Sequence, residues 1–138
     1  MTNLQDSRIS RWIFAAGAGF AMLAVMTGAF AAHGLKHMLG ADYLAIFETA
    51  ARYQMYHAIA LMIVAVISTM PQFSPRWTKL AAFAFMLGIV LFSGSLYLLA
   101  LSGIKWLGAI TPLGGVAFIF GWLALLVAVL KHPAQTTR

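Results

Sequence analysis

The sequence predicts an all-α membrane protein in which a single domain, residues 1–138, forms a bundle of four transmembrane helices. Of its 138 residues, 62% are hydrophobic and only 9% are charged, whereas soluble globular proteins carry ~25% charged residues. A helix needs ~20 apolar residues to cross the hydrocarbon core of a bilayer. Four stretches come close to that length without a charged side chain, and they predict spans at residues 12–32, 53–70, 80–104 and 111–130.

The composition excludes several kinds of chemistry and of partner. Without cysteine, the chain forms no disulfide, thiolate-bound metal, iron–sulfur cluster or cysteine nucleophile. The net charge of +6 comes from nine lysines and arginines scattered between the apolar stretches. They make no basic stripe of the kind that binds nucleic acid. We therefore expect no nucleic-acid partner, and we expect these charges to set the orientation of the chain in the membrane.

The first span follows a polar stretch that contains Arg8 and Arg11, and it runs from Trp12 to Ala32. The basic leader and the triplet Ala29-Phe30-Ala31 also resemble a secretory signal peptide with its cleavage site. A signal peptide has an apolar region of ~7–15 residues, so the 21 uncharged residues here favour a membrane span. Small residues spaced three or four apart predict one face that packs against another helix of the same chain. They are Gly17, Ala21, Ala24, Gly28 and Ala32.

A polar segment joins the first two spans, and we expect it at the membrane interface. The piece from His33 to Gly40 is short and basic, and its glycines favour a turn. Asp42 is well placed to cap the next helix. Glu48 and Arg52 then share one face of that helix, and apolar residues share another. The apolar face consists of Tyr43, Leu44, Phe47, Ala51, Met55 and Ala58. This amphipathic start is expected to merge into the second span.

Proline and glycine mark the ends of the remaining spans. The second span is expected to end before Pro71, because proline cannot continue the helical hydrogen-bond ladder. The third span carries no charge from residue 80 to residue 104, and a tight turn around Gly103 follows. Thr111 and Pro112 fit the N-cap and first-turn positions of the fourth span, where the missing N–H of proline carries no penalty.

Four spans place both termini on the same side of the membrane. Six lysines and arginines are expected on that side, namely Arg8, Arg11, Arg76, Lys79, Lys131 and Arg138. Three are expected on the other side, namely Lys36, Arg52 and Lys105. Because positive residues accumulate on the cytoplasmic side, we predict cytoplasmic termini in a cytoplasmic (inner) membrane.

Five polar residues form the candidate functional cluster: His33, Glu48, Arg52, Tyr53 and His57. Polarity next to a membrane is costly, so such residues have a role in structure, interaction or chemistry. Helical spacing places His57 nearly opposite Glu48, which argues against one compact catalytic pocket. Tyr53 and His57 do share a face, and an interfacial aromatic belt is favoured there over a quinone site. We assign no catalytic residue.

Histidine raises the alternative of a cofactor, because neutral imidazole binds metals and haem. His33 and His57 are expected near the same membrane boundary, where they could hold haem, a metal or a quinone. No glutamate follows His33 in an H-E-x-x-H arrangement, and no carboxylate is placed to orient either ring. Structural histidines are therefore the favoured interpretation, with no cofactor and no metal site.

Four sequence blocks carry a family resemblance: GAFAAHGLKHML, FETAARYQMYHAIAL, GSLYLLALSG and LGAITPLGGVAFIFGWLAL. Together they resemble domain-of-unknown-function family 423, small bacterial inner-membrane proteins of four spans with relatives in animal mitochondria. The similarity extends from about Trp12 to Leu130. Ala31 departs from the family pattern GAFGAHGL, which has glycine there. The resemblance implies a four-helix membrane protein of uncharacterised biochemistry and supplies no catalytic residues.

These observations together predict a small integral membrane protein that is not an enzyme and that acts as an accessory or structural component. Its surroundings are the lipid bilayer and either a membrane-protein partner or further copies of the chain. One alternative is a small transporter or channel whose pore lies between the chains of an oligomer. A second is the haem, metal or quinone site at the boundary shared by His33 and His57.

Overall fold

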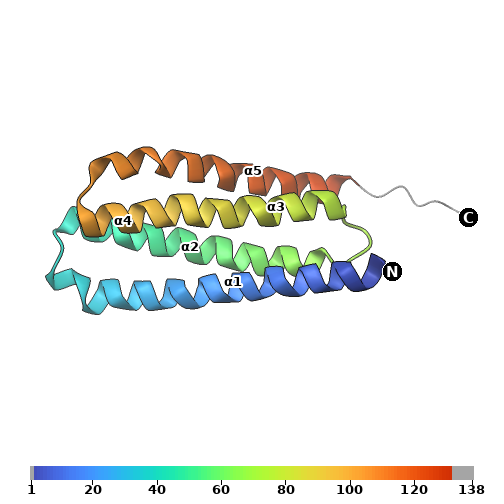
Figure 1. Cartoon of the computed structure of the whole chain (residues 1–138), viewed down its shortest axis with the longest axis horizontal. Helices are drawn as coiled ribbons and strands as arrows, with labels where there is room; N and C mark the ends of the chain where they lie inside the picture. Colours follow the sequence, from blue (N-terminus) through green and yellow to red (C-terminus); the bar gives the residue numbers. More distant parts are fainter. Residues whose placement is uncertain (1, 132–138) are drawn as a thin grey trace, which may run out of the picture.

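The computed structural model describes residues 2–131, with side chains from residue 8 onward. Four of its helical segments are long and apolar enough to cross a membrane, which confirms the predicted fold class (Figure 1). The third of these segments is continuous but changes character, from α3 through the π-helical turn η2 to α4. The elements are α1 (Thr2–His33), the 3₁₀ turn η1 (Leu35–His37), α2 (Ala41–Ile67), α3 (Pro75–Gly88), η2 (Ile89–Ser93), α4 (Gly94–Ser102), the 3₁₀ turn η3 (Lys105–Ala109) and α5 (Thr111–Leu130).

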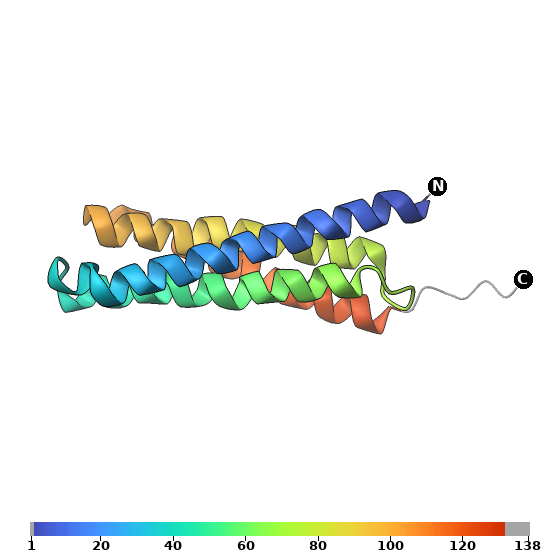
Figure 2. The ribbon, with the colours of Figure 1, turned by 90° about the horizontal axis from the view of Figure 1, so that it is seen from below.

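The helices pack as two antiparallel pairs that lie against each other. α1 packs along α2, and α5 packs along α3, while α2 also contacts α3, η2 and α4. The start of α1 and the end of α5 lie at one end of the bundle in both views (Figures 1 and 2). The turns that follow α1 and α4 lie at the opposite end. An even number of antiparallel spans therefore brings the two chain ends to the same side.

The second span is longer at its start than the sequence predicted. α2 is one continuous helix from Ala41 to Ile67, so the amphipathic start merges into it as expected. The expected bounds of 53–70 began directly after Arg52. They therefore left out Glu48 and Arg52, two charged residues that α2 carries on its exposed face. The true centre of the helix is Gln54. His57, expected near a membrane boundary, consequently lies near the middle of the bundle.

Two of the predicted caps are wrong. Gly40 occupies the N-cap position of α2 with an extended backbone, and no side chain caps the helix. Asp42 lies instead in the first turn, where its negative charge favours the positive end of the helix dipole. Ile110 occupies the N-cap position of α5, so Thr111 is the first residue of the helix. Pro112 does lie in the first turn, as expected.

Part of the small-residue face of α1 packs against α2 as predicted. Gly17 and Ala24 are buried, and a Cβ atom on Gly17 would lie 2.9 Å from the carbonyl oxygen of Ala58. The close approach of the two backbones therefore requires glycine at this position. Ala32 is exposed, and its neighbour Ala31 is buried against Leu35 and Phe47 instead.

The close packing of α5 on the third span also depends on glycines. A Cβ atom on Gly114 would lie 2.3 Å from the backbone nitrogen of Phe92 in η2. A Cβ atom on Gly88 would lie 2.3 Å from the ring of Phe118. Gly103 ends α4 with a positive φ of 72°, a conformation that glycine adopts without strain, and this confirms the predicted turn.

Candidate functional site

A layer of hydrogen-bonded side chains crosses the middle of the bundle, and all four spans contribute to it. We call it the central polar layer, and it consists of Thr27 (α1), Gln54 and His57 (α2), Ser93 (η2), Tyr97 (α4) and Trp122 (α5). Inside a membrane, such bonds hold helices together because lipid tails offer polar groups no alternative partner. Every buried side-chain nitrogen and oxygen of the described residues has a hydrogen-bond partner.

Gln54 links three of the helices. Its amide nitrogen donates to the carbonyl oxygen of Phe20 in α1 at 2.9 Å. Its amide oxygen accepts a hydrogen bond from the hydroxyl of Tyr97 in α4, also at 2.9 Å. The Tyr97 hydroxyl lies 2.9 Å from the hydroxyl of Thr27, which returns the network to α1. A single amide side chain thus fixes the positions of α1, α2 and α4 relative to one another.

The partners of His57 define its protonation state. Its Nδ1 lies 2.8 Å from the carbonyl oxygen of Tyr53, which can only accept, so Nδ1 carries a hydrogen. The indole N–H of Trp122 lies 3.2 Å from Nε2 and can only donate, so Nε2 accepts. His57 is therefore neutral with both nitrogens in use. The ring of Phe118 stacks on it, with centroids 3.4 Å apart and planes at 7°.

The π-helical turn η2 lies at the level of this layer. Such turns are frequent at functional sites because the extra residue changes where side chains and backbone groups point. Here the hydroxyl of Ser93 donates to the carbonyl oxygen of Ala50 in α2 at 2.8 Å. On its other side, η2 contacts α5. The turn therefore fits the third span between its two neighbours.

The five candidate residues do not form one cluster. Tyr53 and His57 lie together, with stacked rings whose centroids are 6.2 Å apart. His33 is exposed at the end of α1, and Glu48 and Arg52 are exposed on the outer face of α2. None of these three side chains makes a hydrogen bond, ion pair or ring contact with another described residue. The structure thus divides the predicted cluster among three separate places.

The geometry places His33 and His57 too far apart to share a ligand. Ala31, two residues before His33, packs in the same core cluster as Phe47. The ten residues from Phe47 to His57 span about 15 Å of helix. Among residues 8–131, whose side chains the structure describes, no group of three histidine or carboxylate side chains could hold a metal ion. The hypothesis of one ligand site at a boundary shared by both histidines was therefore wrong about their positions.

Sequence reasoning missed most of the central polar layer. Thr27, Tyr97 and Trp122 were not singled out, and the predicted bounds of the second span, 53–70, place Gln54 at the water–lipid boundary. One signal was present in the sequence. If the helix begins near Asp42 and not at Tyr53, Gln54 lies at its centre. An amide at that depth needs partners from other helices.

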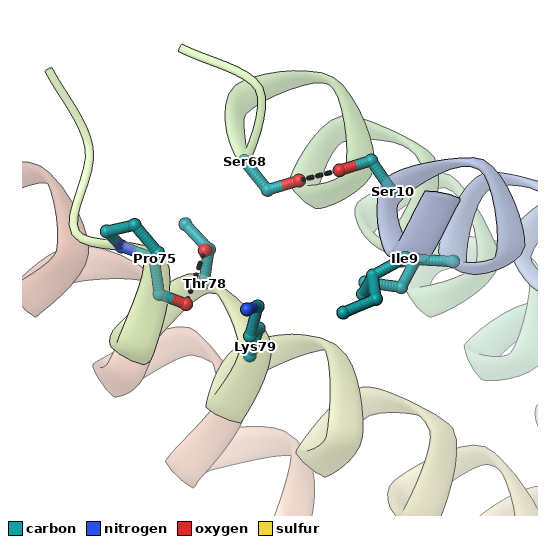
Figure 3. Close-up of a pocket in the computed structure, with 7 residues that line it drawn as sticks. Ile9, Ser10, Ser68, Pro75, Thr78 and Lys79 are labelled. Atoms are coloured by element: carbon teal, nitrogen blue, oxygen red, sulfur yellow. Dashed lines mark hydrogen bonds between the residues drawn. The ribbon is translucent and has the colours of Figure 1, made fainter. Parts of the chain in front are cut away.

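Three surface hollows are described, and none is lined by the central polar layer. Figure 3 shows one at the end of the bundle that holds the start of α1, where the hydroxyls of Ser10 and Ser68 lie 2.7 Å apart. Its volume of about 10 Å³ is at the lower limit for one water molecule. The second, of about 380 Å³, is lined by Arg8, Arg11, Trp12 and Ala15. The third, of about 390 Å³, is an apolar groove lined by Phe14, Ile59, Met62, Ile63, Val66 and Ile67.

Comparison with known proteins gives a family without an assigned activity. Residues 27–115 match the family described as protein of unknown function (DUF423). The chain is 51% identical to a UPF0382 membrane protein of Staphylococcus epidermidis over 115 residues, which cover 83% of this chain and 92% of the relative. A UPF0382 membrane protein of Staphylococcus saprophyticus is 50% identical, over 83% of this chain and 93% of its own. No solved structure gives a significant match.

Proposed function

Because the chain belongs to the DUF423 family of membrane proteins of unknown function, we propose a role that needs no reaction centre inside the bundle. The chain acts as a non-enzymatic accessory or structural component of a larger membrane assembly. Its partners are other membrane proteins or further copies of the chain, held within the bilayer. The family match agrees with the sequence resemblance, which was drawn largely from motifs in the same region.

One observation carries this proposal. The side chains of the central polar layer all have hydrogen-bond partners inside the bundle, whereas Glu48 and Arg52 are exposed on α2 without a described partner. A transporter or enzyme needs polar groups that face a substrate or a water-filled cavity. Here the groups that are free to interact lie on the outer surface. That arrangement suits a protein whose contacts are made with a neighbour in the membrane.

Assembly and transport are separated by two measurements on the full chain. Extracted from its own membranes into lipid nanodiscs, the chain is expected to run as a complex larger than a monomer. Proteoliposomes that contain the chain alone are expected to leak protons and potassium no faster than empty liposomes. Flux that is lost in Glu48→Gln or His57→Ala would contradict the proposal and favour the oligomeric transporter or channel.

We also propose that both termini lie in the cytoplasm and that the membrane is the cytoplasmic membrane. The described basic residues at the terminal end of the bundle outnumber those at the opposite end, which favours the cytoplasm for the terminal end. One of them, Lys131, lies over the ring of Trp77 at 5.3 Å. A fluorescent protein that folds only in the cytoplasm, fused after Arg138, is expected to be fluorescent. An alkaline phosphatase fused at the same position is expected to be inactive, and activity of the phosphatase would reverse the orientation.

A further inference from the structure

The outer face of α2 carries a regular row of exposed side chains. The row consists of Ala45, Glu48, Arg52, Tyr56, Ile59, Ile63 and Val66, and we call it the α2 outer face. Val66 lies 21 positions after Ala45, and the row covers this length in six steps of three or four residues, an average of 3.5. This average is the repeat that keeps one helix in contact with another along a left-handed crossing. The row therefore has the spacing of a helix–helix seam.

The two charges of this face lie within the membrane-spanning part of α2. Ser93 bonds to the carbonyl oxygen of Ala50, which places Ala50 and Ser93 at the same depth. α4 continues for nine residues beyond Ser93, or about 14 Å, before it ends at Ser102. Arg52 lies two residues, or about half a helical turn, closer to the middle of the bundle than Ala50. Charged side chains at such depth are rarely left facing lipid and are normally paired.

The arrangement of these charges fits a second copy of the same chain. A two-fold axis along the membrane normal would place α2 parallel to its own copy, so that the same residues face each other. Glu48 of each copy would then lie one helical turn from Arg52 of the other, and the ion pair would form twice. A different protein would have to present a matching base and acid at the same depth. One chain supplies both charges by itself.

The apolar half of the same face has room for side chains of the second copy. The groove of about 390 Å³ is lined partly by Ile59, Ile63 and Val66, which continue the row from Arg52 toward the C-terminal end of α2. Phe14 of α1 closes the groove from the other side. Association inside a membrane depends on such close packing in addition to polar contacts.

We infer that the α2 outer face docks a second copy of this chain, with Glu48 of each copy paired to Arg52 of the other. The inference rests on the proposed function, for which it names the partner and the surface. It assigns a role to two charged residues that the central polar layer does not use.

The absence of cysteine from the chain allows a direct test by cross-linking in native membranes. Ile59→Cys places a thiol on the α2 outer face, and Leu123→Cys places one at the same depth on exposed α5, beside Trp122, which bonds to His57. After oxidation with copper phenanthroline, Ile59→Cys is expected to give a disulfide-linked dimer at least fivefold more abundant than Leu123→Cys gives. Equal yields, or no dimer from Ile59→Cys, would overturn the inference.

Charge exchange tests the ion pairs in the same Ile59→Cys background. Glu48→Arg alone and Arg52→Glu alone are each expected to lower the dimer yield at least fivefold, because all four charges at the seam then have the same sign and no ion pair can form. The double exchange, Glu48→Arg with Arg52→Glu, is expected to restore at least half of the original yield. Failure of the double exchange to restore it, while Ile59→Cys with native charges still cross-links, would overturn the ion pairs.

Failure of this inference is distinguishable from failure of the proposed function. Cross-linking of Ile59→Cys to a different membrane protein would exclude a second copy as the partner at this face, and the accessory role would still hold. No cross-link at Ile59, together with solute flux by the chain alone, would overturn both.

Discussion

Alanine at position 114 is expected to destabilise the folded bundle by about 3 kcal/mol, the upper part of the range for an overpacked core. The new methyl group would lie 2.3 Å from the backbone nitrogen of Phe92 and 2.7 Å from its Cα. Backbone atoms cannot rotate away as a flexible side chain can, so α5 or η2 would have to shift. Reversible unfolding of the detergent-solubilised chain measures the change in the free energy of unfolding.

Gly115→Ala is the matched control for this substitution. A Cβ atom there would lie 3.9 Å from the ring of Phe92, an ordinary van der Waals contact. Its effect is expected to stay within about 0.5 kcal/mol or to stabilise the helix slightly, because alanine favours helix more than glycine does. Equal effects of the two substitutions would contradict the close packing of α5 on η2.

Loss of the His57 ring is expected to cost about 2–3 kcal/mol of stability. His57→Ala removes the stacking partner of Phe118 and leaves a cavity in the middle of the bundle. It also removes the acceptor for the indole N–H of Trp122. The free energy of unfolding, measured in the same detergent, is the quantity to compare.

His33→Ala serves as the control for His57→Ala, because the His33 side chain is exposed at the end of α1. Its effect is expected to stay within about 0.5 kcal/mol. If His57→Ala lowered the free energy of unfolding no more than His33→Ala does, the structural role assigned to the central polar layer would be wrong.

Patterns within one helix were predictable from the sequence. Charge-free length identified four spans, and the expected bounds of the fourth, 111–130, agree with α5. Helical periodicity also placed His57 nearly opposite Glu48, and in the structure Glu48 is exposed whereas His57 is buried. These features depend only on the spacing of residues along one helix, which the sequence contains directly.

Contacts between helices were not predictable in the same way. The bonds that join Gln54 to Tyr97 and to the backbone of Phe20 depend on the rotation of each helix and on its offset along the bundle. Neither quantity follows from periodicity. The depth of His57 was missed because the predicted span was taken to start after the charged residues Glu48 and Arg52. The helix in fact starts at Ala41, so His57 lies near its middle. The π-helical turn η2 was missed because no residue type marks the place where a helix gains one residue per turn.

The most direct measurement of the structural role of these polar groups is an analysis of the full chain after gentle detergent extraction. It combines an absorption spectrum with metal and quinone determination, repeated for His33→Ala and His57→Ala. Because both nitrogens of His57 are already hydrogen-bonded, we expect no haem, metal or quinone bound at His57 in stoichiometric amount. A stoichiometric group that is present in the parent chain and lost in His57→Ala would contradict the structural role and identify the middle of the bundle as a ligand site.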